Sequence, residues 1–323
     1  MGAPMPSMSL HSPIPDLWAP RRHPYYVFCP EYRESSSGVV ALHVLCHALN
    51  LAGHEAWVTT GVTSPRLRTP VVHQGVERGH SAAGLVPVVV YPEVVSGNPL
   101  RAPVVARFLL NKPGLLGGDK TYAPSELLFS FSPEFLPPGM KAEPLMVPVF
   151  DLGLFRPGLP RAERRGRCFY ASRYLESGGT LGDEVRGCTE LSMRTPRALA
   201  ELAALFQTTE LLYSYERSAL CTEAMLCGCP VVYLPNPVLA EFPAEAQLGR
   251  DGAAWGNSPE EVARAQATVD RIYGRVRDLQ QAFWGELERF VSITQAAAGA
   301  HAAALARAGA TGPQRLGARV NRA

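Results

Sequence analysis

The sequence contains little charge of either sign. Charged residues occupy 19% of its 323 positions, and 31 basic against 29 acidic residues leave a net charge of +2. So small an excess provides no strong field for a nucleic-acid backbone, and a nucleic-acid partner is therefore not expected. A hydrophobic content of 46% is enough to build a buried core, and the length is typical of two domains.

Long apolar runs and secretory features are also missing. No stretch approaches the roughly 18 uninterrupted apolar residues of a membrane-spanning helix, and the proline-rich start lacks the apolar run of a signal peptide. The seven cysteines are odd in number and lie mostly within apolar runs, which is typical of buried thiols in a reducing compartment. We therefore expect a cytoplasmic protein without a disulfide framework.

Several familiar catalytic signatures are absent. The sequence has no Walker-type loop, no Gly-x-Ser-x-Gly elbow and no His-Glu-x-x-His helix. His43 and His47 have the i, i+4 spacing that can hold a metal, but no third ligand follows at a suitable interval. We interpret them as part of a half-buried helix face, and we expect no metal site.

The chain does contain a regular alternation of short apolar runs and helical patterns. A strand over residues 25–29, a helix from about residue 38, a stop at Gly53 and a strand over residues 55–60 predict a parallel crossover unit. Further strands are predicted at residues 85–93, 104–111, 126–131 and 144–150. A linker rich in proline, glycine and arginine follows, and after it strands are predicted at residues 167–174, 189–192, 210–215 and 229–235. This alternation predicts an α/β fold with two Rossmann-like domains that face each other across a cleft.

The same pattern predicts the domain boundaries. We expect a flexible lead-in over residues 1–24, an N-terminal Rossmann-like domain over residues 25–150 and a C-terminal one, with a closing helix, over residues 151–293. Residues 294–323 are rich in alanine and arginine, and we interpret them as a frayed helix or a disordered tail that adds little to the core.

The segment around Glu216 carries the most chemical information. A strand is predicted to end at Tyr213, Glu216 follows in the turn, and a helix begins near Ser218. The backbone amides of Ser218 and Ala219, together with the positive end of the helix dipole, would attract a phosphate. Glu223 lies on the same helix, so two carboxylates flank the anion site. The pattern suits a nucleotide sugar, whose hydroxyl groups donate hydrogen bonds to carboxylates.

This segment resembles the acidic signature of the retaining glycosyltransferases of family 4. In that family a glutamate before the helix contacts the transferred sugar, and a second glutamate on the helix holds the ribose. The second half of the signature is matched by Glu223, Ala224, Gly228, Pro230, Val231 and Val232. The first half departs from it, because six residues rather than seven separate Glu216 from Glu223, and Tyr215 occupies the expected position. The alternative is a pair of carboxylates on a solvated helix turn.

Two arginines are candidates for binding the diphosphate. Residues 169–174 resemble the strand that delivers a phosphate-binding arginine in the family, which makes Arg173 the predicted charge clamp. The lysine that accompanies it in the family is missing here. Arg194, near the tip of the next predicted strand, is the candidate substitute, although a surface ion pair would also explain it.

The N-terminal half offers fewer site residues. The segment around Gly38 is similar to the glycine-containing first loop of the family, where backbone approaches the donor, and a helix start capped by Ser37 is the alternative. Polar groups also stand near predicted strand ends, namely Glu93, Asn98, Arg107, Asn111 and Lys112. Of these we expect Asn111 and Lys112 to contact donor or acceptor. The family's histidine in this region has no counterpart.

The resemblance implies an enzyme of the GT-B type that moves a sugar from a nucleotide diphosphate donor to a glycan or lipid-linked hydroxyl with retention. Glu216 and Arg173 would be its catalytic residues, no metal or other cofactor is implied, and the leaving diphosphate would take the acceptor proton. Surface polysaccharide synthesis and contact with the inner face of a membrane are further expectations. A nucleotide-sugar 2-epimerase and a non-catalytic protein with the same fold remain alternatives, and the oligomeric state is open.

Overall fold

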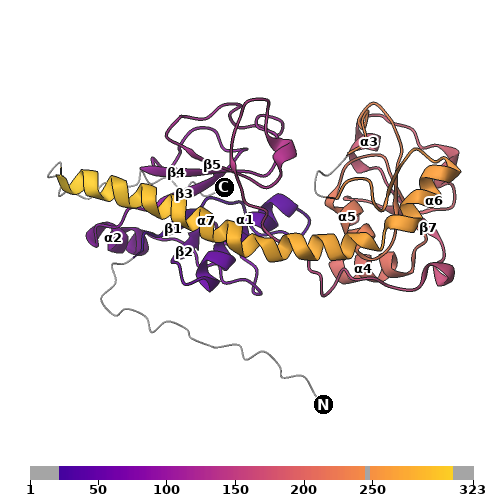
Figure 1. Cartoon of the computed structure of the whole chain (residues 1–323), viewed down its shortest axis with the longest axis horizontal. Coiled ribbons are helices and arrows are strands. Elements are labelled where there is room, and N and C mark those ends of the chain that lie inside the picture. Colours follow the sequence, from indigo (N-terminus) through magenta and orange to yellow (C-terminus); the bar gives the residue numbers. More distant parts are fainter. Residues whose placement is uncertain (1–21, 244–247, 308–323) are drawn as a thin grey trace, which may run out of the picture.

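The computed structural model describes residues 22–243 and 248–307, and it contains two α/β domains connected by a long helix (Figure 1). The first domain holds a six-stranded sheet in the order β2-β1-β3-β4-β5-β6, and the second a five-stranded sheet in the order β11-β10-β9-β7-β8. All paired strands in both sheets run parallel. The prediction of two Rossmann-like domains is therefore confirmed.

The N-terminal domain follows the predicted alternation closely. Its elements are β1 (Tyr25–Val27), α1 (Ser37–Leu51), β2 (Ala56–Val58), α2 (Gln74–Ala82), β3 (Val88–Pro92), β4 (Val104–Leu109), β5 (Leu127–Ser130), the 3-10 helix η1 (Pro133–Phe135) and β6 (Glu143–Pro144). Strands β3 and β4 are buried along their whole length, as expected for parallel strands with helices on both faces. The strand predicted over residues 144–150 is wrong beyond Pro144. Pro148 has no N–H group to donate to a neighbouring strand.

The C-terminal domain begins in the predicted linker. Its elements are η2 (Arg161–Glu163), β7 (Arg167–Tyr170), α3 (Ser172–Glu176), η3 (Asp183–Val185), β8 (Thr189–Leu191), α4 (Leu199–Thr208), β9 (Leu211–Ser214), α5 (Ala219–Leu226), β10 (Val231–Tyr233), β11 (Ala253–Trp255) and α6 (Pro259–Thr268). The linker packs tightly, since Phe155 is buried in the core and the Arg164 guanidinium donates to the carbonyls of Phe206 and Cys227. The strand predicted over residues 167–174 ends at Tyr170, where α3 follows.

Helix α7 (Arg271–Arg307) belongs to both domains, which corrects two predictions. Its first turns place Ile272 and Val276 in the core of the second domain, whereas Phe283 and Phe290 lie in the core of the first (Figure 1). Assigning the closing helix to the C-terminal domain alone is therefore wrong. So is a frayed tail beginning at residue 294, because the helix continues to Arg307 and small side chains such as Ala298 let it approach the sheet closely.

The start of the N-terminal domain packs against α7. The Tyr25 hydroxyl lies 2.8 Å from the hydroxyl of Thr294, and the backbone N–H of His23 donates to the Gln295 side chain at 2.9 Å. The remainder of the predicted lead-in and tail, residues 1–21 and 308–323, lies outside the described residues. Among the helices that are described, none is both long enough and apolar enough to cross a bilayer.

Candidate functional site

The strand order of the second sheet reverses between β7 and β9. From β7 the chain crosses to β8 on one side and then returns to β9 on the other, so that Tyr170 and Ser214 are partners at neighbouring strand ends. Such a reversal leaves a crevice at the carboxyl ends of the strands, and ligands of open parallel sheets bind there. The predicted residues follow these two strands, Arg173 in the short helix α3 after β7 and Glu216 in the turn after β9.

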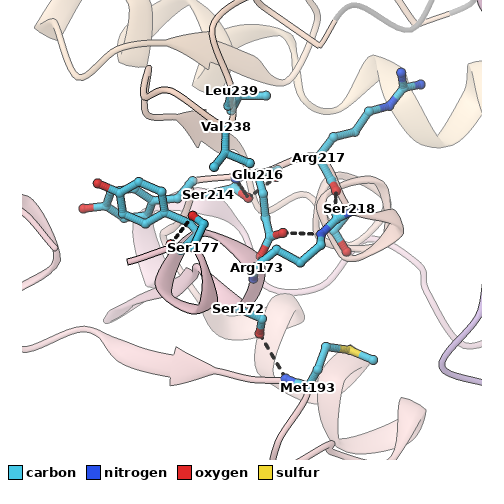
Figure 2. Close-up of polar contacts among 12 residues, drawn as sticks. Ser172, Arg173, Ser177, Met193, Ser214, Glu216, Arg217, Ser218, Val238 and Leu239 are labelled. Carbon is cyan, nitrogen blue, oxygen red and sulfur yellow. Dashed lines mark hydrogen bonds and ion pairs between the residues drawn. The ribbon is translucent and has the colours of Figure 1, made fainter. Parts of the chain in front are cut away.

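Arg173 and Glu216 form a close pair over this switch point, as Figure 2 shows. Glu216 accepts the backbone N–H of Arg173 at 2.9 Å and its Nε–H group at 2.5 Å. The Nη2 group of Arg173 donates to the carbonyl oxygen of Arg217 at 2.5 Å. Glu216 is 1% exposed, whereas the side chain of Arg173 is 61% exposed. A buried carboxylate thus holds an accessible guanidinium in place.

The burial of Glu216 does not fit the prediction that it contacts a transferred sugar. Both carboxylate oxygens accept hydrogen bonds from Arg173, and almost no surface remains for a sugar hydroxyl. The hydroxyl of Ser214 donates to the Glu216 carbonyl at 2.6 Å, which folds the turn back on the end of β9. The turn therefore directs the carboxylate toward Arg173 rather than toward solvent.

Two residues that the sequence analysis missed tie the neighbouring strand ends together. The Ser172 hydroxyl accepts the backbone N–H of Met193, which follows β8, at 3.1 Å (Figure 2). The side chain of Asn236, which follows β10, donates to the carbonyl of Tyr215 at 2.8 Å. Asn236 stands between two prolines, a recognisable turn signal, whereas nothing in the sequence distinguishes Ser172 from other loop serines.

Helix α5 begins beside the Arg173–Glu216 pair. Ser218 is its N-cap, and the Ser218 hydroxyl accepts the backbone N–H of Leu220 at 3.3 Å. Burial and the charge of Glu216 raise the pKa of Tyr170, while hydrogen bonds with Ser172 and Ser218 oppose that rise. The Tyr170 hydroxyl therefore lies between the end of β7 and the start of α5. The predicted amides of Ser218 and Ala219 thus stand at the same strand ends as Arg173.

Glu223, one turn further along α5, has no partner of its own. Among the described residues, no hydrogen bond or ion pair joins its side chain to another residue. Burial raises the pKa of the Glu223 carboxyl from 4.5 to about 7. A largely buried carboxyl without a partner destabilises the fold when it ionises, and such groups are concentrated at functional sites.

Arg194 lies at the same edge of the sheet, on the exposed loop after β8. Its backbone N–H donates to the Ser192 hydroxyl at 3.1 Å, and the preceding residue, Met193, makes the contact with Ser172. Its guanidinium has no hydrogen bond or ion pair with any of the described residues. Arg194 is therefore near the switch point but is not held in place as Arg173 is.

The predicted residues of the N-terminal domain gather at the carboxyl edge of the first sheet. Asn111 and Lys112 follow the end of β4 after one intervening residue, and the Lys112 N–H donates to the Asn111 side chain at 2.8 Å. A Cβ on Gly38 would stand 3.8 Å from the Leu110 side chain, so the start of α1 adjoins the end of β4. The helix cap is Ser36 rather than Ser37, and no side chain caps the helix.

The carboxyl edges of the two sheets meet at Arg217. This residue follows β9, whereas Glu134 and Phe135 follow β5 in the other domain. The Arg217 guanidinium donates to the Glu134 carboxylate at 3.3 Å and lies 5.8 Å from the centre of the Phe135 ring. No sequence pattern predicts a contact between residues so far apart in the chain.

The contacts of His43 and His47 agree with the prediction that they belong to a half-buried helix face. His43 Nε2 lies 3.0 Å from the Pro30 carbonyl oxygen, and His47 accepts the backbone N–H of Arg68 at 2.8 Å. Within residues 22–243 and 248–307, no three His, Cys, Asp or Glu side chains gather as a metal site would require. All seven cysteines are free, and six of them are buried, as predicted.

Comparison with known proteins gives structural similarities only. No family model and no curated protein matches the sequence. The glycosyltransferase SnogD from Streptomyces nogalater is 16% identical, with a TM-score of 0.48 over 85% of this chain and 99% of that one. The spinosyn forosaminyltransferase SpnP is 14% identical, with a TM-score of 0.46 over 84% of this chain and 100% of that one. The glycosyltransferase VinC in complex with DTDP is 14% identical, with a TM-score of 0.45 over 83% of this chain and 99% of that one. At these TM-scores the similarity assigns neither substrate nor residue roles.

Proposed function

We propose that the protein is a glycosyltransferase that takes its sugar from a nucleotide diphosphate donor. The observation that carries the proposal is the Arg173 guanidinium, held by a buried Glu216 at the switch point beside the N-terminus of α5. A fixed cation and a helix N-terminus at one crevice suit a diphosphate. The unpartnered Glu223 on the same helix is available for the ribose hydroxyls.

In this proposal each residue has a distinct task. Arg173 and the amides at the start of α5 bind the diphosphate and stabilise the negative charge that grows on it as the sugar leaves. Glu216 fixes the orientation of Arg173, and Glu223 accepts hydrogen bonds from the ribose. Asn111 and Lys112, at the facing edge of the other domain, contact the acceptor, a glycan or lipid-linked hydroxyl.

Retention is proposed on the resemblance of the Glu223 segment to family 4. The acceptor hydroxyl would attack on the face from which the diphosphate departs, and a diphosphate oxygen would take its proton. Closure of the two domains would orient donor and acceptor and keep out water that would hydrolyse the donor.

The proposal is tested by incubating the protein with UDP-, dTDP- and GDP-linked sugars and hydroxyl acceptors. We expect one nucleotide diphosphate to be released in step with a new glycoside, equally fast with and without a chelator. Proton NMR of the first anomer formed shows independently whether the anomeric configuration of the donor sugar is retained. Formation of an epimer without nucleotide release would support the 2-epimerase alternative, and absence of both binding and turnover would support a non-catalytic protein.

A further inference from the structure

Arg217 contacts both the candidate donor site and the other domain. Its backbone carbonyl accepts the hydrogen bond from Arg173, while its side chain reaches Glu134 and Phe135 after β5. Figure 2 shows the guanidinium of Arg217 pointing away from Arg173. The backbone carbonyl of Arg217 and its side chain therefore make their contacts on opposite sides of the residue. One residue therefore connects the surroundings of Arg173 to the N-terminal domain.

The neighbours of Arg217 make its backbone position important. Glu216, which precedes it, holds Arg173, and Ser218, which follows it, caps α5. Glu216, which holds Arg173, and Ser218, which caps the helix, are therefore both covalently bonded to Arg217. A shift of this turn by even a fraction of an ångström would change the hydrogen bonds on both sides, because these bonds are sensitive to distance and angle.

The contact with Glu134 is suited to forming and breaking. The Arg217 and Glu134 side chains are 41% and 21% exposed, and ion pairs at such positions contribute little to stability. The pair is therefore too weak to hold the domains together by itself. It can instead respond to their separation, because Glu134 moves with the first domain and the Arg217 turn with the second.

We propose that Arg217 is a positioning residue that couples contact between the domains to the geometry of the donor site. With the domains together, Glu134 fixes the Arg217 turn, and the Arg217 carbonyl holds Arg173 in the orientation that stabilises the leaving diphosphate. With the domains apart, the turn is released and the clamp loses one of its hydrogen bonds. Sugar transfer is thereby favoured only when the acceptor domain is in place. This inference rests on the proposed function.

The test removes the charge of Glu134 without changing its shape. For Glu134→Gln we expect kcat for sugar transfer to fall about tenfold, with KM for the donor and affinity for the bare nucleotide diphosphate changed less than about threefold. Asp151→Asn is the matched control, since it breaks another ion pair, between Arg66 and Asp151 at 3.0 Å, that does not adjoin the donor site. The control should transfer sugar at the wild-type rate.

A charge exchange separates the contact from other effects of substitution. The double variant Glu134→Arg with Arg217→Glu keeps the backbone carbonyl and restores an ion pair. Its kcat should therefore be at least threefold higher than that of Glu134→Arg or of Arg217→Glu alone. Wild-type kcat in Glu134→Gln, or an equal loss in Asp151→Asn, overturns the coupling and leaves the proposed function standing. A wild-type protein that neither binds a nucleotide diphosphate nor transfers a sugar overturns both.

Discussion

Arg107 and Arg173 both stand toward the carboxyl ends of parallel strands beside a glutamate, yet they differ in what surrounds them. Arg107 on β4 is completely buried, pairs with Glu126 and donates to the carbonyls of Val95 and Gly97 at 2.8 and 2.9 Å. Arg173 reverses this arrangement, because its glutamate is buried and the guanidinium is exposed. The first arginine has its hydrogen-bonding capacity filled within the protein, whereas the second retains groups for a ligand.

This difference separates a structural arginine from a binding arginine that looks the same in the sequence. The Arg107 guanidinium also lies over the rings of Tyr91 on β3 and of Tyr122, at 5.3 and 4.9 Å from their centres, and so fastens the loop that carries Tyr122 to the sheet. Glu93 and Asn98, which the sequence places near the same strand ends, likewise bond to backbone, at Leu110 and Ala102. We therefore assign this cluster to stability, whereas Arg173 is the arginine that we propose for binding.

The largest effect is expected from removing the buried arginine. Arg107→Met leaves the Glu126 carboxylate and two carbonyls without their donor, and it should lower the free energy of unfolding by about 3–5 kcal/mol. Denaturant unfolding measures the change. Arg186→Met, at an exposed arginine, is the control and should change stability by less than about 0.5 kcal/mol. A loss below about 1 kcal/mol for Arg107→Met would show that the cluster does not have this role.

Glu223 extends the comparison to a carboxyl that has no hydrogen bond or ion pair with any of the described residues. Because its pKa is raised in the folded state, the fold is most stable when Glu223 is protonated, below pH 4.5, and loses this stability as the pH rises through about 7. Glu223→Gln removes the cost of ionisation. Relative to wild type, it should therefore gain up to about 3 kcal/mol in free energy of unfolding between pH 5 and pH 8.

Unfolding curves at the two pH values measure this gain. Glu201→Gln, on an exposed part of α4, is the matched control. The same Glu223→Gln variant should bind a nucleotide diphosphate more weakly at pH 8, because an amide has lost the charge of the carboxylate. A gain that is the same at both pH values would mean that Glu223 ionises freely in the folded protein.

The smallest effect on the fold is expected at the exposed arginine. Arg173→Lys keeps the charge near Glu216 but loses the planar fork that binds phosphate oxygens in pairs. Affinity for a nucleotide diphosphate should fall about tenfold, or about 1.4 kcal/mol, while the free energy of unfolding changes by less than about 1 kcal/mol. Calorimetric titration measures the affinity. If Arg194→Lys causes the larger loss, Arg194 is the phosphate clamp.

Local patterns were enough to predict most of the sheet strands and the segment after β9 that carries Glu216 and Glu223, whereas Arg173 was predicted within a strand and lies on α3. Apolar runs bounded by proline, glycine or serine mark β3, β4 and β9 because parallel strands are buried on both faces. Helix α2 and strand β11 were missed, since α2 is largely exposed and the three residues of β11 are too short to form a pattern.

Properties that depend on distant parts of the chain could not be predicted from the sequence. Whether Glu216 faces a sugar or an arginine depends on the end of β7, which lies 43 residues earlier. The contact of Arg217 with Glu134 spans 83 residues. The alanines beyond Thr294 suggest fraying when considered alone, but Ala298 is fully buried in the core cluster that also contains Tyr25 and Phe129.

Helix α7 also determines when the first domain can fold during synthesis. Phe290 and Ala298 fill the core beneath β1 and β5, yet the ribosome adds them only after the whole second sheet has been made. The domain that leaves the ribosome first therefore stays without part of its core until the second domain is complete, contrary to the usual order in which N-terminal domains fold first. A chain arrested before α7 would therefore expose the apolar surface that Phe290 and Ala298 cover in the complete fold.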